Sequence, residues 1–538
     1  MKSKNINKKT YPRAILFLGI LTLCISACTK NFEEFNTDPD GLTDDQTVDI
    51  IASAIGPMEQ DIFSNYQTAQ NLNADAFAGY MMSPTPFNGG LNNLNYNMID
   101  LWDKNAFNDA YTLIMAPVKK MAEAGVRDKA PEIWAVSLLI QIVAIDRTTD
   151  RFGPIPYTQT GTSLKEIPYD SQEKVYKTFF KQLDTAVANL NTYISNQSGA
   201  SSLENGDLIY HGNYKKWLKF ANTLRLRLAM RIVKVAPDLA KTQGEKALAD
   251  SGGLLKTAAD NALVEQSGGR ANDIWTVTAS YGDNRLNAAL ATYMTGYNDP
   301  RLPCYATPAT DPEVQGKYIG IRTGMITGDN TKDDYINYAS LNTETTFNHD
   351  APQLIMTSAE AFFLKAEAAL RGWSGAGNAE ENYVNGIKAS FAQWGITDPG
   401  TINSYLHNST ATPDDYVDPK KTANNAQALT NISIEWESSA SKEKKLERII
   451  TQKWIAIFPD GQEAWADYRR TGYPKLFPVV HNNSNGEIST SEQIRRIPYP
   501  STEYNTNGEA VDEAVSKYLD GKDTGGSRIW WDVDKGNF

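Results

Sequence analysis

Residues 358–370, SAEAFFLKAEAAL, and residues 379–394, AEENYVNGIKASFAQW, decide the fold. Both stretches place apolar residues at helical spacing, and the glycine-rich turn RGWSGAGN between them ends the first helix. Tyr383 and Phe391 are large enough to fill the space between two such helices. Small residues recur where the helices would touch, at Ala366, Ala369, Gly386 and Ala389. The sequence therefore predicts a tightly packed helical hairpin.

This hairpin resembles a tetratricopeptide unit, and earlier helices repeat it in a longer and looser form. The predicted pairs are 99–124 with 130–146, and 171–194 with 214–235, the last ending before Pro237. Residues 47–82 and 446–458 also show helical spacing, whereas 252–284 and 298–350 are rich in Gly, Asn, Asp and Pro. Loops of this length are commonly functional. The expected fold is mainly α, a tetratricopeptide-type hairpin scaffold with a loop-rich, ligand-binding half containing short β-strands.

The N-terminus predicts export and lipid attachment. A basic start precedes the apolar run at 14–23, which is too short to span a bilayer. Ile25-Ser26-Ala27 then leads to Cys28, the pattern at which a lipoprotein signal peptide is cleaved and the cysteine acylated. Cys24 is the alternative, but the bulky Leu23 before it fits poorly. An ordinary secretory peptide with an incidental cysteine is a second alternative. The expected organisation is a signal peptide (1–27), an acylated tether (28–46) and one domain (47–538).

Composition excludes several classes of function. The chain has 52 basic and 64 acidic residues among 538, which argues against nucleic acid as a partner. After removal of Cys24 and acylation of Cys28, only Cys304 remains, so no intrachain disulfide is expected. The four histidines are far apart and form no ligand-spaced pair. We expect no metal site and no cofactor.

An ordered set of short blocks resembles the SusD/RagB family of nutrient-binding outer-membrane lipoproteins, and more narrowly its SusD-like subgroup. The set spans nearly the whole mature chain. The blocks are Asn36-Thr-Asp-Pro39, Arg151-Phe-Gly-Pro-Ile-Pro-Tyr157, Asn298-Asp-Pro-Arg-Leu-Pro303, Lys365-Ala-Glu-Ala-Ala-Leu370, Gly386-Ile-Lys-Ala-Ser-Phe391, Gln452-Lys-Trp-Ile-Ala-Ile-Phe458, the run GQEAWADYRRTGY at 461–473, Arg495-Arg-Ile-Pro-Tyr-Pro500 and Trp530-Trp-Asp532.

The resemblance implies a receptor on the outer membrane, held by its lipid anchor and exposed at the cell surface. Its partner would be a SusC-like TonB-dependent transporter, to which it would pass captured oligosaccharide. Relatives in the RagB branch are linked to peptides, so a peptide ligand is an alternative. A lysine followed by two glutamates, Lys30, Glu33 and Glu34, resembles a surface-export signal.

No hydrolytic motif is present. The sequence has no Gly-x-Ser-x-Gly elbow, no His-Glu-x-x-His and no phosphate-binding Gly-x-x-x-x-Gly-Lys. We therefore expect a binding protein and no catalytic residues. A surface glycan hydrolase and a purely structural tetratricopeptide adaptor are the other two hypotheses. Asp467, Arg469 and Arg470 suit a ligand carboxylate, but a buried ion-pair network reaching the loops around Arg495 and Arg496 is favoured.

Candidate ligand contacts are aromatic residues outside the helical stripes, in loops that also carry Asn or Arg. Rings of this kind stack on sugar faces, and amides bond to sugar hydroxyls. Two segments qualify, 80–102 and 272–285, with Tyr335 and Tyr338 as a fallback. The predicted contacts are Tyr80, Phe87, Asn92, Asn95, Tyr96, Trp102, Trp275, Tyr281, Asn284 and Arg285.

Overall fold

A hairpin of two helices, α15 (Ser358–Leu370) and α16 (Ala379–Gln393), forms where the sequence predicts it in the computed structural model. The Thr357 side chain caps α15 by accepting a hydrogen bond from the Glu360 N–H, and Asn378 caps α16 in the same way. At the seam, a Cβ on Gly386 would lie 2.8 Å from the ring of Phe363. The close approach of the two helices therefore requires glycine at position 386.

The structure describes residues 51–162, 165–196, 201, 203–325 and 334–538. The predicted signal peptide, Cys28 and the tether lie outside the described residues. Those from Ile51 onward belong to one compact unit. Within them, no helix is both long enough and apolar enough to cross a membrane.

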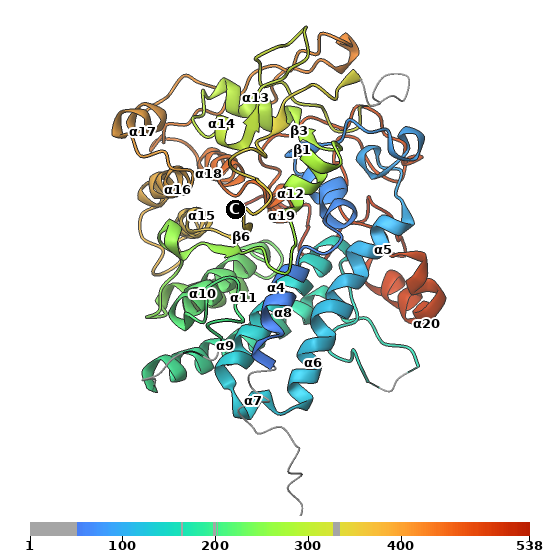
Figure 1. The fold of residues 1–538 in the computed structure, drawn as a ribbon, viewed down its shortest axis with the longest axis vertical. Helices are drawn as coiled ribbons and strands as arrows, with labels where there is room; N and C mark the ends of the chain where they lie inside the picture. The colour runs from blue at the N-terminus through green and yellow to red at the C-terminus, as the bar shows by residue number, and fades with distance from the viewer. Residues whose placement is uncertain (1–50, 163–164, 197–200, 202, 326–333) are drawn as a thin grey trace, which may run out of the picture. The chain divides into compact units, whose positions relative to one another are not determined.

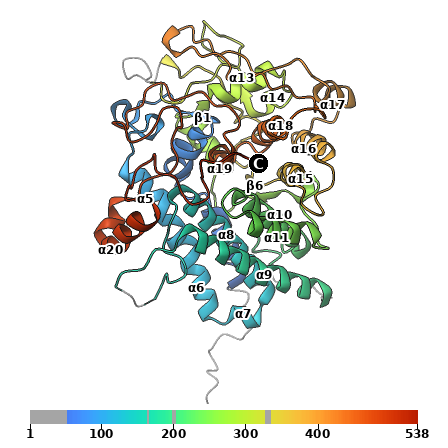
Figure 2. The same ribbon diagram turned by 180° about the vertical axis from the view of Figure 1, so that it is seen from behind.

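Four further helices continue the scaffold: α8 (Pro131–Phe152), α9 (Gln172–Asn196), α10 (Tyr214–Arg231) and α11 (Pro237–Ala249). Figures 1 and 2 show them beside the α15–α16 hairpin from both sides. The most extensive contacts join α8 to α9, α10 to α11 and α15 to α16. The predicted hairpin pairing is therefore wrong by one helix, since α8 pairs chiefly with α9 and α10 chiefly with α11.

The prediction for residues 214–235 is also wrong at its end. Helix α10 stops at Arg231, and Pro237 begins α11 rather than ending the helix before it. Proline suits the first turn of a helix because its missing N–H would have no partner there. Pro237 was thus interpreted as the end of one helix, whereas it marks the start of the next.

Residues 47–82, predicted as one helical stretch, are interrupted in the described part. Helix α4 (Ile55–Asp61) is followed by a π-helical segment, η1 (Gln67–Asp75), and a short strand, β1 (Met81–Met82). Asn65 and Gly79 adopt positive φ angles of 50° and 73° at the two breaks. Residues 99–124 divide similarly into α5 (Asp100–Asp109), a π-helical segment η4 (Ala110–Met115) and α6 (Ala116–Glu123).

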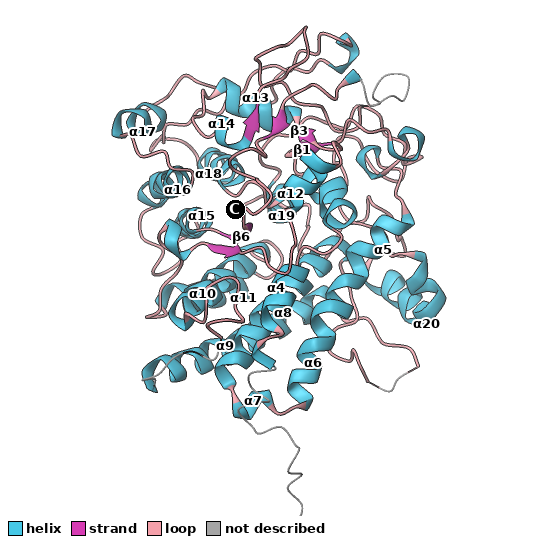
Figure 3. Cartoon of the chain, in the orientation of Figure 1, coloured by secondary structure: helices cyan, strands magenta, loops and turns pink. Residues whose placement is uncertain are grey.

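The remaining half is rich in loops and short elements, as Figure 3 shows. Its three small antiparallel sheets pair β1 with β3 (Arg285–Leu286), β2 (Ala262–Val264) with β6 (Gln353–Met356), and β4 (Ala306–Thr307) with β5 (Ser340–Leu341). The other helices are α7 (Val126–Lys129), α12 (Asp273–Trp275), α13 (Ala288–Gly296), α14 (Leu302–Tyr305), α17 (Pro399–Leu406), α18 (Lys442–Ala456), α19 (Gly461–Thr471) and α20 (Ser501–Tyr518). The predicted mainly α fold with short strands is confirmed.

Helices α18 and α19 contact residues 75–80, which precede strand β1. The indole N–H of Trp454 donates to the Ala78 carbonyl at 2.8 Å, and the Tyr80 hydroxyl donates to the Trp454 carbonyl. Gly461 begins α19 so close to Asp75 that a Cβ would lie 2.2 Å from the Asp75 carboxylate. Residues more than 370 positions apart are thus in direct contact.

Buried ion pairs connect the helices at the centre of the scaffold. Arg227 and Arg231 lie one turn apart on α10, where Arg227 binds both oxygens of Glu360 at 2.7 and 2.6 Å. Arg231 reaches Asp150 at 3.1 Å and also binds Glu463. All five side chains are buried. Because each charge faces an opposite charge, these contacts fix α8, α10, α15 and α19 relative to one another.

Candidate functional site

The two segments predicted to carry ligand contacts lie together in the fold. Strand β1 pairs with β3, so that Met81 faces Leu286 and Met82 faces Arg285. Beyond the strands, the Thr85 hydroxyl donates to Asp283. We call residues 83–91 and 275–285 the ligand edge. The sequence indicated each segment, but their pairing is a result of the three-dimensional fold.

Most of the predicted contact residues are buried in this region. Tyr80, Asn284 and Arg285 are enclosed beside the β1–β3 pair, and Arg285 donates through Nε to the Ile336 carbonyl at 2.6 Å. Burial lowers the pKa of Arg285 to about 10, against the opposing effect of Asp283. Tyr96 and Trp102 are also enclosed, with exposed fractions of 3% and 8%. As placed, these five side chains present little surface to a ligand.

The asparagines of the first segment bond to the protein itself. Asn92 caps the short helix at Asn93–Asn95, and its amide donates to the Phe87 carbonyl at 2.8 Å. Asn95 donates to the Gly90 carbonyl. Both are buried. The sequence criterion of aromatic residues beside asparagine thus identified a loop that is stabilised by its own amides.

The fallback pair is enclosed as well. Tyr335 and Tyr338 are each 2% exposed, and both hydroxyls donate to Asp418, at 3.0 and 2.9 Å. Burial and the nearby Asp418 carboxylate raise the pKa of both tyrosines.

Three of the predicted residues retain accessible surface: Phe87, Trp275 and Tyr281. Phe87 is half-buried and packs edge-on against Trp102, with ring centroids 5.7 Å apart. Trp275 is half-buried and meets the exposed His349 ring at 4.8 Å. Tyr281 is 52% exposed. These rings offer the stacking surface expected of the ligand edge.

A pocket of about 140 Å³ is lined by residues close in sequence to Trp275 and His349, although these two residues do not line it themselves. The segments that carry these two rings also line it, through Asn272, Ile274, Phe347 and Pro352. They are held together by a bond from the Asn272 N–H to the His349 carbonyl at 2.8 Å. The remaining lining residues are Phe63, Tyr66, Gln70, Leu263, Thr346, Gln353, Leu354, Gln393, Trp394, Pro459 and Asp460. We call this space the amide pocket.

The polar groups of the amide pocket are mostly neutral. Gln70, Asn272, Gln353 and Gln393 line it together with one carboxylate, Asp460. Among the described residues, the indole N–H of Trp394 has no hydrogen-bond partner. A cavity of similar size in another protein holds a benzene molecule, so the amide pocket has room for one ring or one substituent. Apolar walls with a few convergent amides are typical of binding sites for small neutral ligands.

Sequence reasoning missed several residues of the amide pocket. Trp394 was predicted as the end of a helix, and Gln393 lies beside it. Phe347-Asn348-His349 satisfies the criterion applied to the other two segments, an aromatic residue beside Asn in a loop, and was overlooked. Gln353 lies in a strand, β6, and carries no comparable signal.

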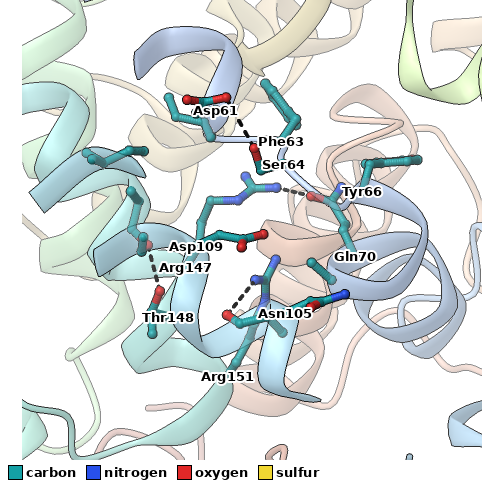
Figure 4. A pocket seen from close by; sticks show the side chains of 16 residues that line it. Asp61, Phe63, Ser64, Tyr66, Gln70, Asn105, Asp109, Arg147, Thr148 and Arg151 are labelled. Carbon is teal, nitrogen blue, oxygen red and sulfur yellow. Dashed lines mark hydrogen bonds between the residues drawn. The ribbon is translucent and has the colours of Figure 1, made fainter. Parts of the chain in front are cut away.

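A second, polar pocket shares Phe63, Tyr66 and Gln70 with the amide pocket, and Figure 4 shows its lining residues. Arg147 and Arg151 reach into it from α8, beside Asp109. Burial lowers the pKa of Arg151 to about 9, and the Arg147 charge acts in the same direction. Its volume of about 20 Å³ accommodates roughly one water molecule. This pocket is therefore too small for a saccharide.

The Asp-Tyr-Arg-Arg block is structural, as favoured from the sequence. Arg470 binds Glu367 and Asp467, and Arg469 donates to the carbonyl of Arg495 at 2.9 Å. The predicted buried network that reaches the loop around Arg495 is thereby confirmed. No group of three or more metal-ligating side chains comes together in the described part of the chain.

Known proteins show the same fold along nearly the whole chain. The sequence model of the SusD-like family, described as SusD and RagB outer membrane lipoprotein, matches residues 34–532. This chain belongs to the SusD-like family. The predicted family is therefore confirmed, and its members are outer membrane lipoproteins.

Solved structures of other SusD-like proteins agree. A chitin-binding SusD homologue from Flavobacterium johnsoniae is 41% identical, covers 91% of this SusD-like chain and 100% of its own, and superposes with a TM-score of 0.86. A SusD-like protein from Bacteroides thetaiotaomicron is 33% identical, with coverages of 90% and 100% and a TM-score of 0.84. A SusD homologue from Bacteroides vulgatus is 35% identical, with coverages of 90% and 98% and a TM-score of 0.84. No curated protein matches the chain.

Proposed function

We propose that this protein binds oligosaccharides at the cell surface and delivers them to a SusC-like TonB-dependent transporter. The observation that carries the proposal is the relationship to a chitin-binding SusD homologue, 41% identical over 100% of that chain. Oligomers of N-acetylglucosamine are therefore the first ligands to test. The ligand edge and the amide pocket are the proposed site.

The chemistry of the site supports a neutral saccharide. Trp275, His349 and Tyr281 offer accessible ring surface, and sugar faces pack well on such rings. Amides both donate and accept hydrogen bonds, as sugar hydroxyl and acetamido groups do. Those of the pocket already bond within the protein: Asn272 caps α12, Gln70 donates to Asp75, Gln353 donates to Asp273, and Gln393 accepts from Asn261. A ligand would therefore use their remaining hydrogen-bonding positions. The unpartnered indole N–H of Trp394 supplies one more donor. An acetamido group is small enough for the pocket, and its methyl group suits the apolar walls.

Binding without cleavage agrees with the carboxylates of the site. A glycosidase of the usual type needs two carboxyl groups facing each other across the sugar. Asp460 lines the amide pocket and is already 3.3 Å from Arg147, and Asp283 of the ligand edge accepts a hydrogen bond from Thr85. We therefore place recognition here, and propose no hydrolysis.

Titration calorimetry of the purified protein tests the ligand. We expect N-acetylglucosamine oligomers to bind with a Kd on the order of micromolar to millimolar, since a receptor must release its cargo. Cello-oligosaccharides, malto-oligosaccharides and a peptide library serve as comparisons. Products are analysed in the same samples. Binding of peptides alone would favour the alternative ligand class, and cleavage of the saccharide would favour a hydrolase.

Purification in mild detergent tests the partner. A stable complex requires an interface well above about 1,000 Å². We expect the lipid-anchored protein to retain a β-barrel transporter of the SusC type. Repeated purification without such a barrel would contradict the proposed delivery step, even if saccharide binding is retained.

A further inference from the structure

A basic cleft lies apart from the proposed saccharide site. It has a volume of about 430 Å³ and shares no lining residue with the amide pocket. The end of α19 contributes to it, together with Lys234 in the turn after α10, loop residues near positions 475 and 493, and residues 528–537. Its charged lining residues are Lys234, Arg469, Arg470, Lys475, Glu492, Arg495, Arg528, Asp534 and Lys535.

Three of the seven cations are already paired with carboxylates. Arg470 binds Glu367 and Asp467, as described above. Arg495 binds Asp532 beneath the cleft. Arg528 binds Asp532 at 2.9 Å and Glu492 at 3.0 Å, so Glu492 is occupied as well. The charges of Arg470, Arg495 and Arg528 are therefore already balanced by carboxylates of the protein.

Four cations remain without an ion pair. In the described residues, no carboxylate forms a salt bridge with Lys234, Arg469, Lys475 or Lys535. Lys234 donates its ammonium proton to the Arg470 carbonyl at 3.0 Å. Of the two acids that line the cleft, Glu492 is paired with Arg528, and Asp534 has no ion pair within the described part of the chain. The cleft thus carries an excess of positive charge in a chain whose formal net charge is −12.

Arg469 is the most informative of these cations because it is 2% exposed. Its Nη1 donates to the carbonyls of Asp150 and Arg495 at 2.6 and 2.9 Å, while its Nη2 has no partner. The Arg469 guanidinium also packs on the rings of Trp465 and Trp531, 3.6 and 4.7 Å from their centroids, so it adds positive charge to the wall of the cleft from a fixed position. Burial lowers the pKa of Arg469 to about 9, although the nearby carboxylates of Asp150 and Asp532 oppose the shift.

Neutral polar groups complete the cleft. Thr471, Ser491, Gln493 and Asn537 line it, and the Oδ1 atom of Asn537 has no hydrogen-bond partner. These groups suit sugar hydroxyls, while ammonium and guanidinium groups are strong donors to carboxylate and sulfate oxygens. The volume matches one or two sugar units and is much smaller than a folded protein.

We propose that the basic cleft binds the carboxylate or sulfate group of an acidic saccharide. The site is separate from the amide pocket, so the proposal does not depend on which neutral saccharide binds there.

Titration of the full mature protein with glucuronate and with N-acetylglucosamine 6-sulfate tests the proposal, with glucose as the neutral comparison. We expect saturable binding of at least one of the two acidic sugars and none of glucose. Raising the salt concentration should weaken the binding, because screening reduces the attraction between charges. The double variant Lys234→Met, Lys475→Met should bind at least about tenfold more weakly, since each lost charged hydrogen bond carries over 1 kcal/mol.

The matched control is the double variant Lys365→Met, Lys388→Met, which removes the same charge from a groove beside α15 and α16. It should bind the acidic sugars as the unmodified protein does. Equal loss in both double variants would overturn the proposal, as would equal binding of glucose and glucuronate. Binding of inorganic sulfate or of an acidic peptide, with no binding of either acidic sugar, would also overturn it. Melting temperatures of all variants separate loss of the cleft from loss of the fold.

Discussion

Arg470 and Glu367, which are 103 positions apart in the sequence, form a two-point ion pair in the core. Nη1 of Arg470 lies 2.6 Å from one carboxylate oxygen of Glu367, and Nη2 lies 2.8 Å from the other. Both side chains are 1% exposed. Burial would raise the pKa of Glu367, but Arg470 and Arg371 outweigh it and lower the pKa to about 2. This pair joins α19 to α15, the first helix of the hairpin.

Replacing Glu367 by Gln should lower the free energy of unfolding at pH 7 by about 3 kcal/mol, because Arg470 would lose a buried counter-ion. The pKa is lowered in the folded state, so the stabilisation is present above pH 4.5 and is lost as the pH falls toward about 2. The difference in the free energy of unfolding between the variant and the unmodified protein should therefore disappear in acid. Urea unfolding between pH 2 and 7 measures this. The exposed Glu513→Gln should differ by less than about 0.5 kcal/mol; a pH-independent effect of Glu367→Gln would contradict the ion-pair explanation.

We expect the contribution of Asp103 to the free energy of unfolding to have the opposite pH dependence. Burial raises its pKa to about 8, although the hydrogen bond from Asn93 opposes the shift. Its charged form is disfavoured in the folded state, so stability is lost as the pH rises from about 4 through 8. Asp103→Asn should raise the free energy of unfolding at pH 8 by at least about 1 kcal/mol and change it little at pH 4. Chemical unfolding at both pH values checks this, and equal effects at both would show that charge is not the cause.

Tyr96 is a core residue by position, despite its place in a predicted ligand loop. Its ring is 3% exposed and meets Phe77 edge-on at 6.3 Å. Tyr96→Ala should lower the free energy of unfolding by about 3–5 kcal/mol because it leaves a cavity. Tyr504→Ala, at a residue that is 38% exposed, is the control and should cost much less. If Tyr96→Ala instead abolishes saccharide binding with an unchanged melting temperature, the ring is a ligand contact.

Trp275 and Tyr281 are the aromatic residues that should carry saccharide binding. Either change to alanine should weaken binding by roughly 2 kcal/mol, about thirtyfold, since one stacking surface is lost. The two together should abolish detectable binding. Calorimetry with the saccharide found for the unmodified protein measures this. Trp436→Ala, a half-buried tryptophan of another groove, is the matched control and should bind normally. Normal binding by the double variant would place the ligand elsewhere.

Cys28 remains the predicted lipid attachment site and lies outside the described residues. Cys28→Ala should abolish metabolic labelling with a fatty acid and release the protein from membranes. Cys24→Ala is the matched control and should leave labelling unchanged. Labelling that persists in Cys28→Ala and disappears in Cys24→Ala would move the anchor to the alternative cysteine.

The scaffold was readable from the sequence because its helices carry regular apolar spacing. Ser358–Leu370 was predicted to the residue, and the end of the second hairpin helix differs by one position. Helix α11 was missed because Pro237 is compatible with both the end of one helix and the start of another. The break at Gly79 was missed because local spacing does not reveal its distant neighbours: a Cβ there would lie 3.0 Å from Ala289 and 3.1 Å from Leu476.

The site was readable only in part. The two loops were identified by composition, but an asparagine that caps a turn and one that faces a ligand look the same in a sequence. Asn92 is of the first kind, because its partners are Phe87 and Leu94. Trp394 was assigned to a helix end, and the pocket that it lines is completed by residues far away in the sequence, among them Phe63, Asn272 and Pro459. Burial thus decides among candidates that composition treats alike.

The long-range contacts of the N-terminal segment have a consequence for the order in which the molecule folds. Residues 74–82 pair with β3, about 200 positions later, and contact α18 and α19, nearly 400 positions later. Hairpins such as α8–α9 close short loops and can form early. Contacts between distant residues close long loops, which costs more conformational entropy, so they form later. The ligand edge therefore belongs to the late stages of folding. Until α18 and α19 pack against residues 74–82, the ligand edge lacks the contacts that position it.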